Sequence, residues 1–209
     1  PASIPHSIWH ADDIRRMERE AADSLGLTLY ELMQRAGEAA FQVTREAYPN
    51  ARHWLVLCGH GNNGGDGYVV ARLAKAQGLD VTLLAQESDK PLPGEAQQAQ
   101  DAWLNAGGVI HAVDISWPDS VDVIIDALSG TGLKHAHRES LSEVIESANS
   151  HPAHVVAIDI PSGLLAQTGA TPGAVINAAH TVPFIALKPG LLKGKARDVT
   201  GFLHVNALL

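Results

Sequence analysis

A glycine-rich segment at residues 58–67, CGHGNNGGDG, constrains the fold of this chain more than any other feature. It follows the apolar run Trp54–Leu57 and precedes a run with helical spacing at 68–77. A strand, a glycine-rich turn and a helix in this order form half of a nucleotide-binding unit. Glycines allow the backbone to turn tightly and to approach a ligand closely, and the free N–H groups that open the next helix favour an anion such as phosphate.

Apolar strands alternate with helical patterns along the rest of the chain, which is typical of a mostly parallel sheet covered on both faces. Thr28 and Glu31 form a capping box that marks the start of one helix. We therefore expect a single domain over 1–209 of the α/β class, a Rossmann-like three-layer sandwich with an N-terminal helical pair. The predicted helices are 8–24, 28–47, 68–77, 95–106 and 140–150, and the predicted strands are 53–58, 81–85, 109–113, 121–128, 155–159, 180–185 and 202–205.

The composition argues against several classes of function. A net charge of -8, from 15 basic and 23 acidic residues, is unlike a nucleic-acid-binding surface. No apolar run reaches roughly 18 residues, so we expect no membrane span. Cys58 is the only cysteine, which excludes an intramolecular disulfide and fits a reducing cytoplasm. The 11 histidines contain no ligand pair such as HExxH, which disfavours zinc.

Polar residues gather where three of the predicted strands end. They are the segment 62–66, Asp126 with the second glycine loop at 129–132, and Asp159 with Ser162. Ligands of parallel α/β sheets bind outside the carboxyl ends of the strands. We therefore expect these three segments to form one site, and their coincidence is more informative than any one motif.

The first loop by itself also matches a dehydrogenase. Gly59, Gly61 and Gly64 have the GxGxxG spacing, and Glu87 follows the second strand, where a ribose-binding acid is usual. A lone GxGxxG motif is only weak evidence for a dehydrogenase, however. Asp66 would also repel a pyrophosphate unless a positive charge offsets it. No GxxxxGK[ST] motif occurs, which argues against a P-loop nucleotide hydrolase.

Asn63, Asp126 and Ser162 all offer oxygen atoms to a hard cation. One carboxylate among neutral oxygens suits an ion of low charge better than Mg²⁺ or Zn²⁺. The alternative is that Asp126 and Ser162 only cap loops or helices, as Asp and Ser often do.

Asp159 ends an apolar strand, where partial burial would raise its pKa and make it a usable general acid or base. The alternative is a carboxylate that only binds loop N–H groups. Pro161 restricts the segment between Asp159 and Ser162 and so determines where Ser162 points.

Four motifs in this order resemble the YjeF N-terminal domain, the family of NAD(P)H-hydrate epimerases. They are GNNGGDG at 61–67, VIIDALSGTG at 123–132, DIPSG at 159–163 and KPG at 188–190. The resemblance covers nearly the whole chain. It implies interconversion of the R and S forms of NADHX and NADPHX, which are hydrated, damaged nicotinamide cofactors, without showing which of the two is preferred.

The resemblance also implies a set of site residues. It implies a K⁺ ion held by Asn63, Asp126 and Ser162, which would offset the charge of Asp66. Asp159 is the candidate acid/base. The implied contacts to the dinucleotide are Asn62, Asn63, Gly64, Gly65, Asp66, Gly130, Thr131, Gly132, Leu133, Lys134, His135, Ala136 and Asp159.

From this we expect a cytoplasmic isomerase that forms a homodimer and binds neither nucleic acid nor membrane. In part of the family an ADP- or ATP-dependent dehydratase domain follows, and this chain stops before one. The first alternative is a non-catalytic nucleotide-sensing or scaffold module with the same fold. The second is an ordinary dehydrogenase, but no catalytic His or Tyr-x-x-x-Lys motif supports it.

Pro183 lies within the predicted strand 180–185 and has no N–H to donate. If that strand is central, the sheet loses one backbone hydrogen bond there, so the extent of the strand is open.

Overall fold

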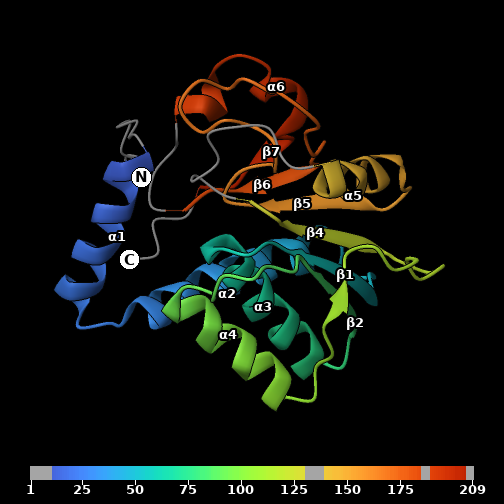
Figure 1. The fold of residues 1–209 in the computed structure, drawn as a ribbon, viewed down its shortest axis with the longest axis horizontal. Coiled ribbons are helices and arrows are strands. Elements are labelled where there is room, and N and C mark those ends of the chain that lie inside the picture. Colours follow the sequence, from blue (N-terminus) through green and yellow to red (C-terminus); the bar gives the residue numbers. More distant parts are fainter. Residues whose placement is uncertain (1–10, 130–138, 185–188, 206–209) are drawn as a thin grey trace.

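A computed structural model describes residues 11–129, 139–184 and 189–205 of the chain. Its centre is a seven-stranded sheet in the order β3-β2-β1-β4-β5-β6-β7, in which all neighbouring strands are parallel (Figure 1). This confirms the predicted Rossmann-like α/β class. The strands are β1 His53–Cys58, β2 Asp80–Ala85, β3 His111–Ala112, β4 Val123–Ala127, β5 His154–Ile158, β6 His180–Val182 and β7 Phe202–Leu203. The helices are α1 Ala11–Leu25, α2 Leu29–Ala47, α3 Asn62–Ala76, α4 Gly94–Asn105, α5 Glu139–Ser150 and α6 Ala196–Val199, with a 3₁₀ turn η1 at Pro189–Leu192.

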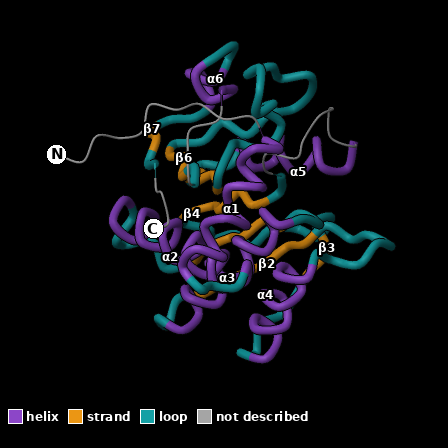
Figure 2. The backbone as a smooth tube through the Cα atoms, turned by 90° about the vertical axis from the view of Figure 1, so that its left-hand side faces the viewer, coloured by secondary structure: helices purple, strands orange, loops and turns teal. Residues whose placement is uncertain are grey.

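Helices cover both faces of the sheet, as the apolar strands require (Figures 1 and 2). Side chains alternate along β1, so that Trp54 and Val56 face α2, α3 and α4, whereas Leu55 and Leu57 face α5. α1 packs against α2 at the side of the molecule. The Thr28–Glu31 capping box is present, because the Glu31 N–H donates to Thr28 Oγ1 at 3.0 Å.

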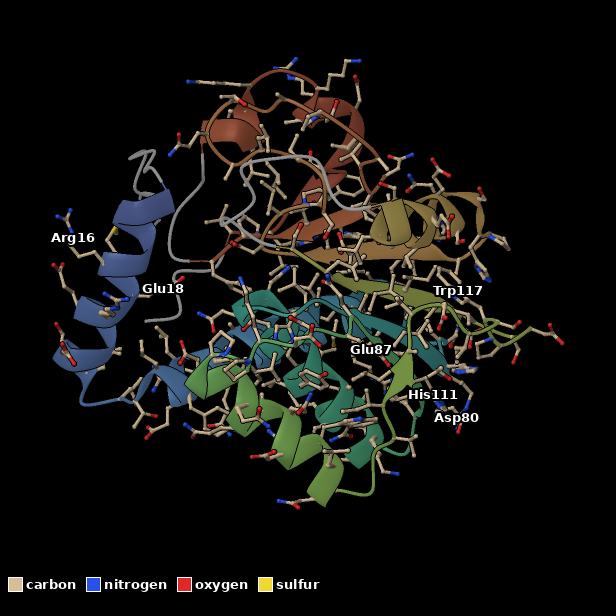
Figure 3. The ribbon with its side chains drawn as sticks, in the orientation of Figure 1. Arg16, Glu18, Asp80, Glu87, His111 and Trp117 are labelled. Atoms are coloured by element: carbon tan, nitrogen blue, oxygen red, sulfur yellow. The ribbon has the colours of Figure 1, made fainter. Side chains whose placement is uncertain are left out.

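The strand order places a topological switch point between β1 and β4. From β1 the chain moves outward through β2 to β3, then returns to β4 on the other side of β1 and continues to β7. The two α/β connections that begin at β1 and β4 therefore diverge. Ligands of open α/β sheets bind at such a point, outside the carboxyl ends of the strands. Asp80 and Glu87 mark the two ends of β2 in Figure 3, and Glu87 lies beyond the carboxyl end.

The glycine-rich segment is helical, which corrects the predicted loop over 59–67. α3 begins at Asn62 rather than near Tyr68. Glycine is unfavourable inside a helix, so propensity alone places it in a loop. Tertiary packing decides otherwise here: a Cβ on Gly67 would lie 2.7 Å from Ala127 Cβ, and one on Gly65 would lie 2.6 Å from Met33 Sδ. The glycines thus let α3 approach the sheet and its neighbouring helices.

Several element ends differ from the prediction for identifiable reasons. β6 lies between β5 and β7 and ends at Val182, because Pro183 has no N–H to donate to a neighbouring strand. β3 is only two residues long, at the edge of the sheet, and Asp159 lies outside β5. η1 and α6 were absent from the prediction. No helix among the residues described is long and apolar enough to cross a membrane.

Asp122 joins β1 and β4 at the edge opposite the switch point. Its Oδ2 accepts hydrogen bonds from the backbone N–H groups of Arg52 and His53, both at 2.9 Å. These bonds hold the pKa of the Asp122 carboxyl below its usual value. Asp122 is therefore an acidic residue with a structural role, at the ends of β1 and β4 that lie away from Asp126 and Asn63.

We expect Gly64→Ala to lower the free energy of unfolding by about 3 kcal/mol, because overpacking against backbone has little room to relax. A Cβ on Gly64 would lie 2.1 Å from the Gly59 carbonyl oxygen. Gly61→Ala is the matched control within the same motif, since nothing lies within 4 Å of its added Cβ and its φ of -147° is open to any residue. That variant should cost less than about 1 kcal/mol. Urea unfolding of both variants is the measurement, and equal losses would contradict the packing role of Gly64.

Candidate functional site

Asp126 and Ser162 form a buried hydrogen-bonded pair at the carboxyl ends of β4 and β5. Both side chains are fully buried. The Ser162 hydroxyl donates to Asp126 Oδ1 at 2.5 Å, and the Ser162 N–H donates to Oδ2 at 2.8 Å. The Leu128 N–H donates a further bond to Oδ1 at 3.2 Å. Asp126 therefore caps the two loops that follow β4 and β5, which agrees with the capping alternative considered for it.

Ser129 connects this pair to Asn63 at the start of α3. Asn63 Nδ2 donates to the Ser129 carbonyl at 2.7 Å, and the Ser129 N–H donates to Ser162 Oγ at 2.9 Å. Three segments that are far apart in sequence thus meet at the backbone of Ser129. The predicted coincidence of the three strand ends is present in the structure.

One polar atom of this cluster has no protein partner. Asn63 Oδ1 is buried and makes no hydrogen bond, although Nδ2 of the same amide is bonded. A buried acceptor of this kind costs about 1–3 kcal/mol unless water or an ion satisfies it. The atom can therefore accept a hydrogen bond from water or a ligand, or face a cation.

The electrostatics of the cluster also suit a cation. Burial raises the pKa of Asp126 to about 6, against three hydrogen bonds that lower it. A nearby positive charge would relieve this cost. The available atoms are carboxylate, amide, hydroxyl and carbonyl oxygens, which are ligands of hard cations. Among the residues described, no group of three or more His, Cys, Asp or Glu side chains is placed to hold a metal ion.

Asp159 has an unusual backbone conformation directly after β5. Its φ is 70°, the only positive value among the non-glycine residues described. Such a conformation costs on the order of 1–3 kcal/mol and is found preferentially at functional sites. The Asp159 N–H donates to the Val182 carbonyl at 2.8 Å, and its Oδ1 accepts a long bond of 3.4 Å from the Phe184 N–H. The second contact resembles the alternative in which the carboxylate binds a loop N–H.

The other predicted site residues are placed differently. Asn62 is exposed and Asp66 is half-buried in the first turns of α3. The position of a Cβ on Gly64 is blocked by the backbone of Gly59. The position of a Cβ on Gly65 is blocked by the side chain of Met33. The predicted contacts at 130–136 lie outside the described residues. Cys58 is a buried core residue, as its position on β1 suggests.

Sequence reasoning did not identify the backbone of Ser129 as the centre of the cluster. A carbonyl carries no signal in the amino-acid sequence, and only the position after β4 could have suggested it.

A surface cavity of about 570 Å³ between residues 113–117 and α5 includes none of Asn63, Asp126, Asp159 or Ser162 in its lining. The orphaned amide oxygen and the strained aspartate locate the candidate site better than this open cavity does.

Comparison with known proteins identifies relatives over most of the chain. Residues 29–190 match the model of the family described as YjeF-related protein N-terminus. The bifunctional NAD(P)H-hydrate repair enzyme Nnr of Escherichia coli is 78% identical over 208 residues, which cover 100% of this chain and 40% of that protein. The NAD(P)H-hydrate epimerase of Rhodopirellula baltica is 36% identical over 199 residues, or 93% of this chain and 81% of that protein.

The fold has a solved counterpart as well. A crystal structure of the yeast protein ynu0 has a TM-score of 0.76 at 23% identity and covers 88% of this chain and 82% of that one. This chain spans about 40% of the length of the bifunctional E. coli relative. With the family match over most of its length and these relatives, the chain belongs to the YjeF N-terminal family.

Proposed function

We propose that residues 1–209 form a single epimerase domain that interconverts the R and S forms of NADHX and NADPHX. The observation that carries this proposal is the hydrogen-bonded cluster of Asn63, Asp126, Ser129 and Ser162, with the strained Asp159 directly after β5. The names of the relatives supply the reaction and the substrate class.

The reaction requires a proton shuttle. The substrate carbon carries a hydroxyl group next to the ring nitrogen, so inversion needs either loss and return of water or opening and closure of the ring. Asp159 is the proposed shuttle and would hold the proton on its carboxylate oxygens. The positive φ of Asp159 turns the chain directly after β5, at the edge where α/β sheets bind ligands.

K⁺ is the proposed cofactor, and Asn63, Asp126 and Ser162 are the residues that would hold it. The unpaired Asn63 Oδ1 supports the fit, because it is a buried neutral oxygen that lacks a partner. When bound, the ion would supply positive charge beside the phosphates and offset the carboxylates of Asp126 and Asp66. The first turns of α3 and the segment 130–136 are the proposed contacts of the dinucleotide.

From the family resemblance we infer that the chain forms a homodimer in the cytoplasm. In the bifunctional relatives we infer a dehydratase activity in the part of the protein that this chain does not span. The dehydratase would consume the S form that the epimerase supplies.

A direct assay separates an epimerase from a nucleotide-sensing module. The protein is mixed with purified R-NADHX, and the R and S forms are followed by chromatography. We expect conversion toward the equilibrium mixture well above the spontaneous rate. Thermal stabilisation by NADP or ADP-ribose without any acceleration of epimerisation would contradict the enzyme and favour the sensor.

We expect K⁺ to raise the thermal stability of the protein and Asn63→Ala to abolish this response. An ion at a hundredfold excess over its Kd stabilises the folded state by about 2.7 kcal/mol. The variant loses the amide oxygen that lacks a protein partner, as well as the bond to Ser129. Melting curves in KCl and in choline chloride at equal ionic strength provide the measurement. Gly61→Ala is the control, and an unchanged K⁺ response in Asn63→Ala would remove Asn63 from the ion site.

A further inference from the structure

Three histidines gather on the sheet face opposite to Asp126. His154 begins β5, His180 begins β6 and His204 follows β7. Because Val156 pairs with His180, and His180 with Phe202, the period-two alternation of side chains puts all three histidines on the face covered by α2. The same alternation directs Asp126 to the other face.

Tyr48, at the end of α2, contacts two of these histidines. Its ring stacks on His154 with centroids 5.3 Å apart and is perpendicular to that of His180 at 5.5 Å. His180 and His204 contact each other directly, with ring centroids 5.1 Å apart. The cluster therefore consists of one close pair, His180 and His204, and a third histidine, His154, that stacks on Tyr48.

The close pair presents two ring nitrogens to each other. His180 Nδ1 lies 2.9 Å from His204 Nε2, so one of the two nitrogens donates and the other accepts. When two imidazole nitrogens bind one metal ion at about 2.0–2.1 Å, the N–metal–N angle is usually between about 90° and the tetrahedral value of about 109°. The two nitrogens are then about 2.9–3.4 Å apart. The observed separation thus lies within the range of a bidentate site, and both rings are only partly buried.

We propose that His180 Nδ1 and His204 Nε2 form a bidentate site for a divalent transition-metal ion such as Cu²⁺, Ni²⁺ or Zn²⁺, with water in the remaining positions. Imidazole nitrogens prefer these ions to Mg²⁺ or Ca²⁺. On binding, the proton between the two nitrogens moves to the outer nitrogen of the same ring, so that both histidines coordinate as neutral imidazoles. Burial and the neighbouring His204 and His154 lower the pKa of His180, which favours this neutral form.

The proposed site would join the last two strands of the sheet. β7 contains only Phe202 and Leu203, and it pairs with β6 at the edge among the strands described. A metal ion shared by His180 and His204 would link the two strands through side chains. Binding should therefore stabilise this edge of the sheet, independently of the K⁺ and substrate sites.

Metal titration of the whole chain tests the proposal. The protein is stripped with a chelator, and Zn²⁺ and Cu²⁺ are added separately in a calorimeter near neutral pH. We expect one ion per chain in each case. His204→Gln should weaken binding at least about tenfold, since the loss of even an outer-shell partner of a metal ligand costs 10–100-fold. His180→Gln should do the same. His154→Gln is the matched control, because His154 stacks on Tyr48 and is not part of the hydrogen-bonded pair, and it should bind as the wild type does.

A spectroscopic readout identifies the ligands without depending on a variant that folds. In NMR spectra of the wild type, Zn²⁺ should shift the ring C–H signals of His180 and His204 and leave those of the other histidines in place. Shifts confined to other histidines, or equal affinity in wild type and His204→Gln, would overturn the proposal.

Discussion

Asp159→Asn is expected to reduce the rate of R-to-S conversion by about 10²–10⁴-fold, the usual contribution of a positioned acid or base. Asparagine keeps the side-chain oxygen that accepts from the Phe184 N–H and tolerates the φ of 70°. The variant should therefore fold as the wild type does and lose only the proton-carrying group. Conversion of purified R-NADHX, followed by chromatography, measures the loss.

Two further variants separate chemistry from conformation and charge. Asp159→Gly removes the backbone strain together with the carboxylate. We therefore expect a protein at least as stable as the wild type that converts R-NADHX as slowly as Asp159→Asn does. Asp122→Asn removes one negative charge at the opposite edge of the sheet and should leave the rate unchanged. A full rate in both Asp159 variants would show that another group carries the proton.

Asp126→Ala is expected to lower the free energy of unfolding by about 4 kcal/mol. The change leaves the buried N–H groups of Leu128 and Ser162 without acceptors, at about 1–3 kcal/mol each, and opens a small cavity. It also removes the only carboxylate of the proposed ion site. Urea unfolding in K⁺ and in choline buffers should therefore show a less stable protein that has lost the K⁺ response. A stability within about 1 kcal/mol of the wild type would contradict the role of Asp126 at the junction of β4 and β5.

The pH dependence of the wild type gives an independent check on Asp126. Its pKa is about 6 in the folded protein and about 3.9 in an unfolded chain, so the folded state binds more protons between these values. In K⁺-free buffer its contribution to stability is fully present below pH 4 and is lost as the pH rises through 6. Asp126→Asn cannot titrate, and the difference in stability between the two proteins should change over this range. A constant difference would mean that the carboxyl is not desolvated.

The order of the elements and the location of the site were accessible from the sequence because both depend on short-range patterns. Apolar runs such as Trp54–Leu57 and Val155–Ile158 predict buried strands, and helical spacing between them predicts parallel crossovers. Once the sheet is parallel, its carboxyl ends share one edge, so residues that follow different strands meet there. Asn63, Asp126 and Ser162 could be grouped for this reason alone.

Other features depend on contacts between segments that are distant in sequence. The glycines of the helical segment Asn62–Gly67 lie against Ala127 and Met33, and no local propensity encodes these contacts. The position of the Ser129 carbonyl depends on Asn63 and Ser162 together. The 2.9 Å contact of His180 with His204 depends on the register of β6 and β7, and a shift of that register by one residue would separate the rings.

The sequence by itself thus determined the α/β class, the order of helices and strands along the chain and the three segments that meet after β1, β4 and β5, since periodicity and strand polarity are local properties. Only the tertiary structure decided that the glycine-rich segment opens a helix, that Asn63 Oδ1 is buried without a partner and that Asp159 is held at positive φ. Each of these depends on which atoms surround the residue, and packing between distant segments sets those surroundings.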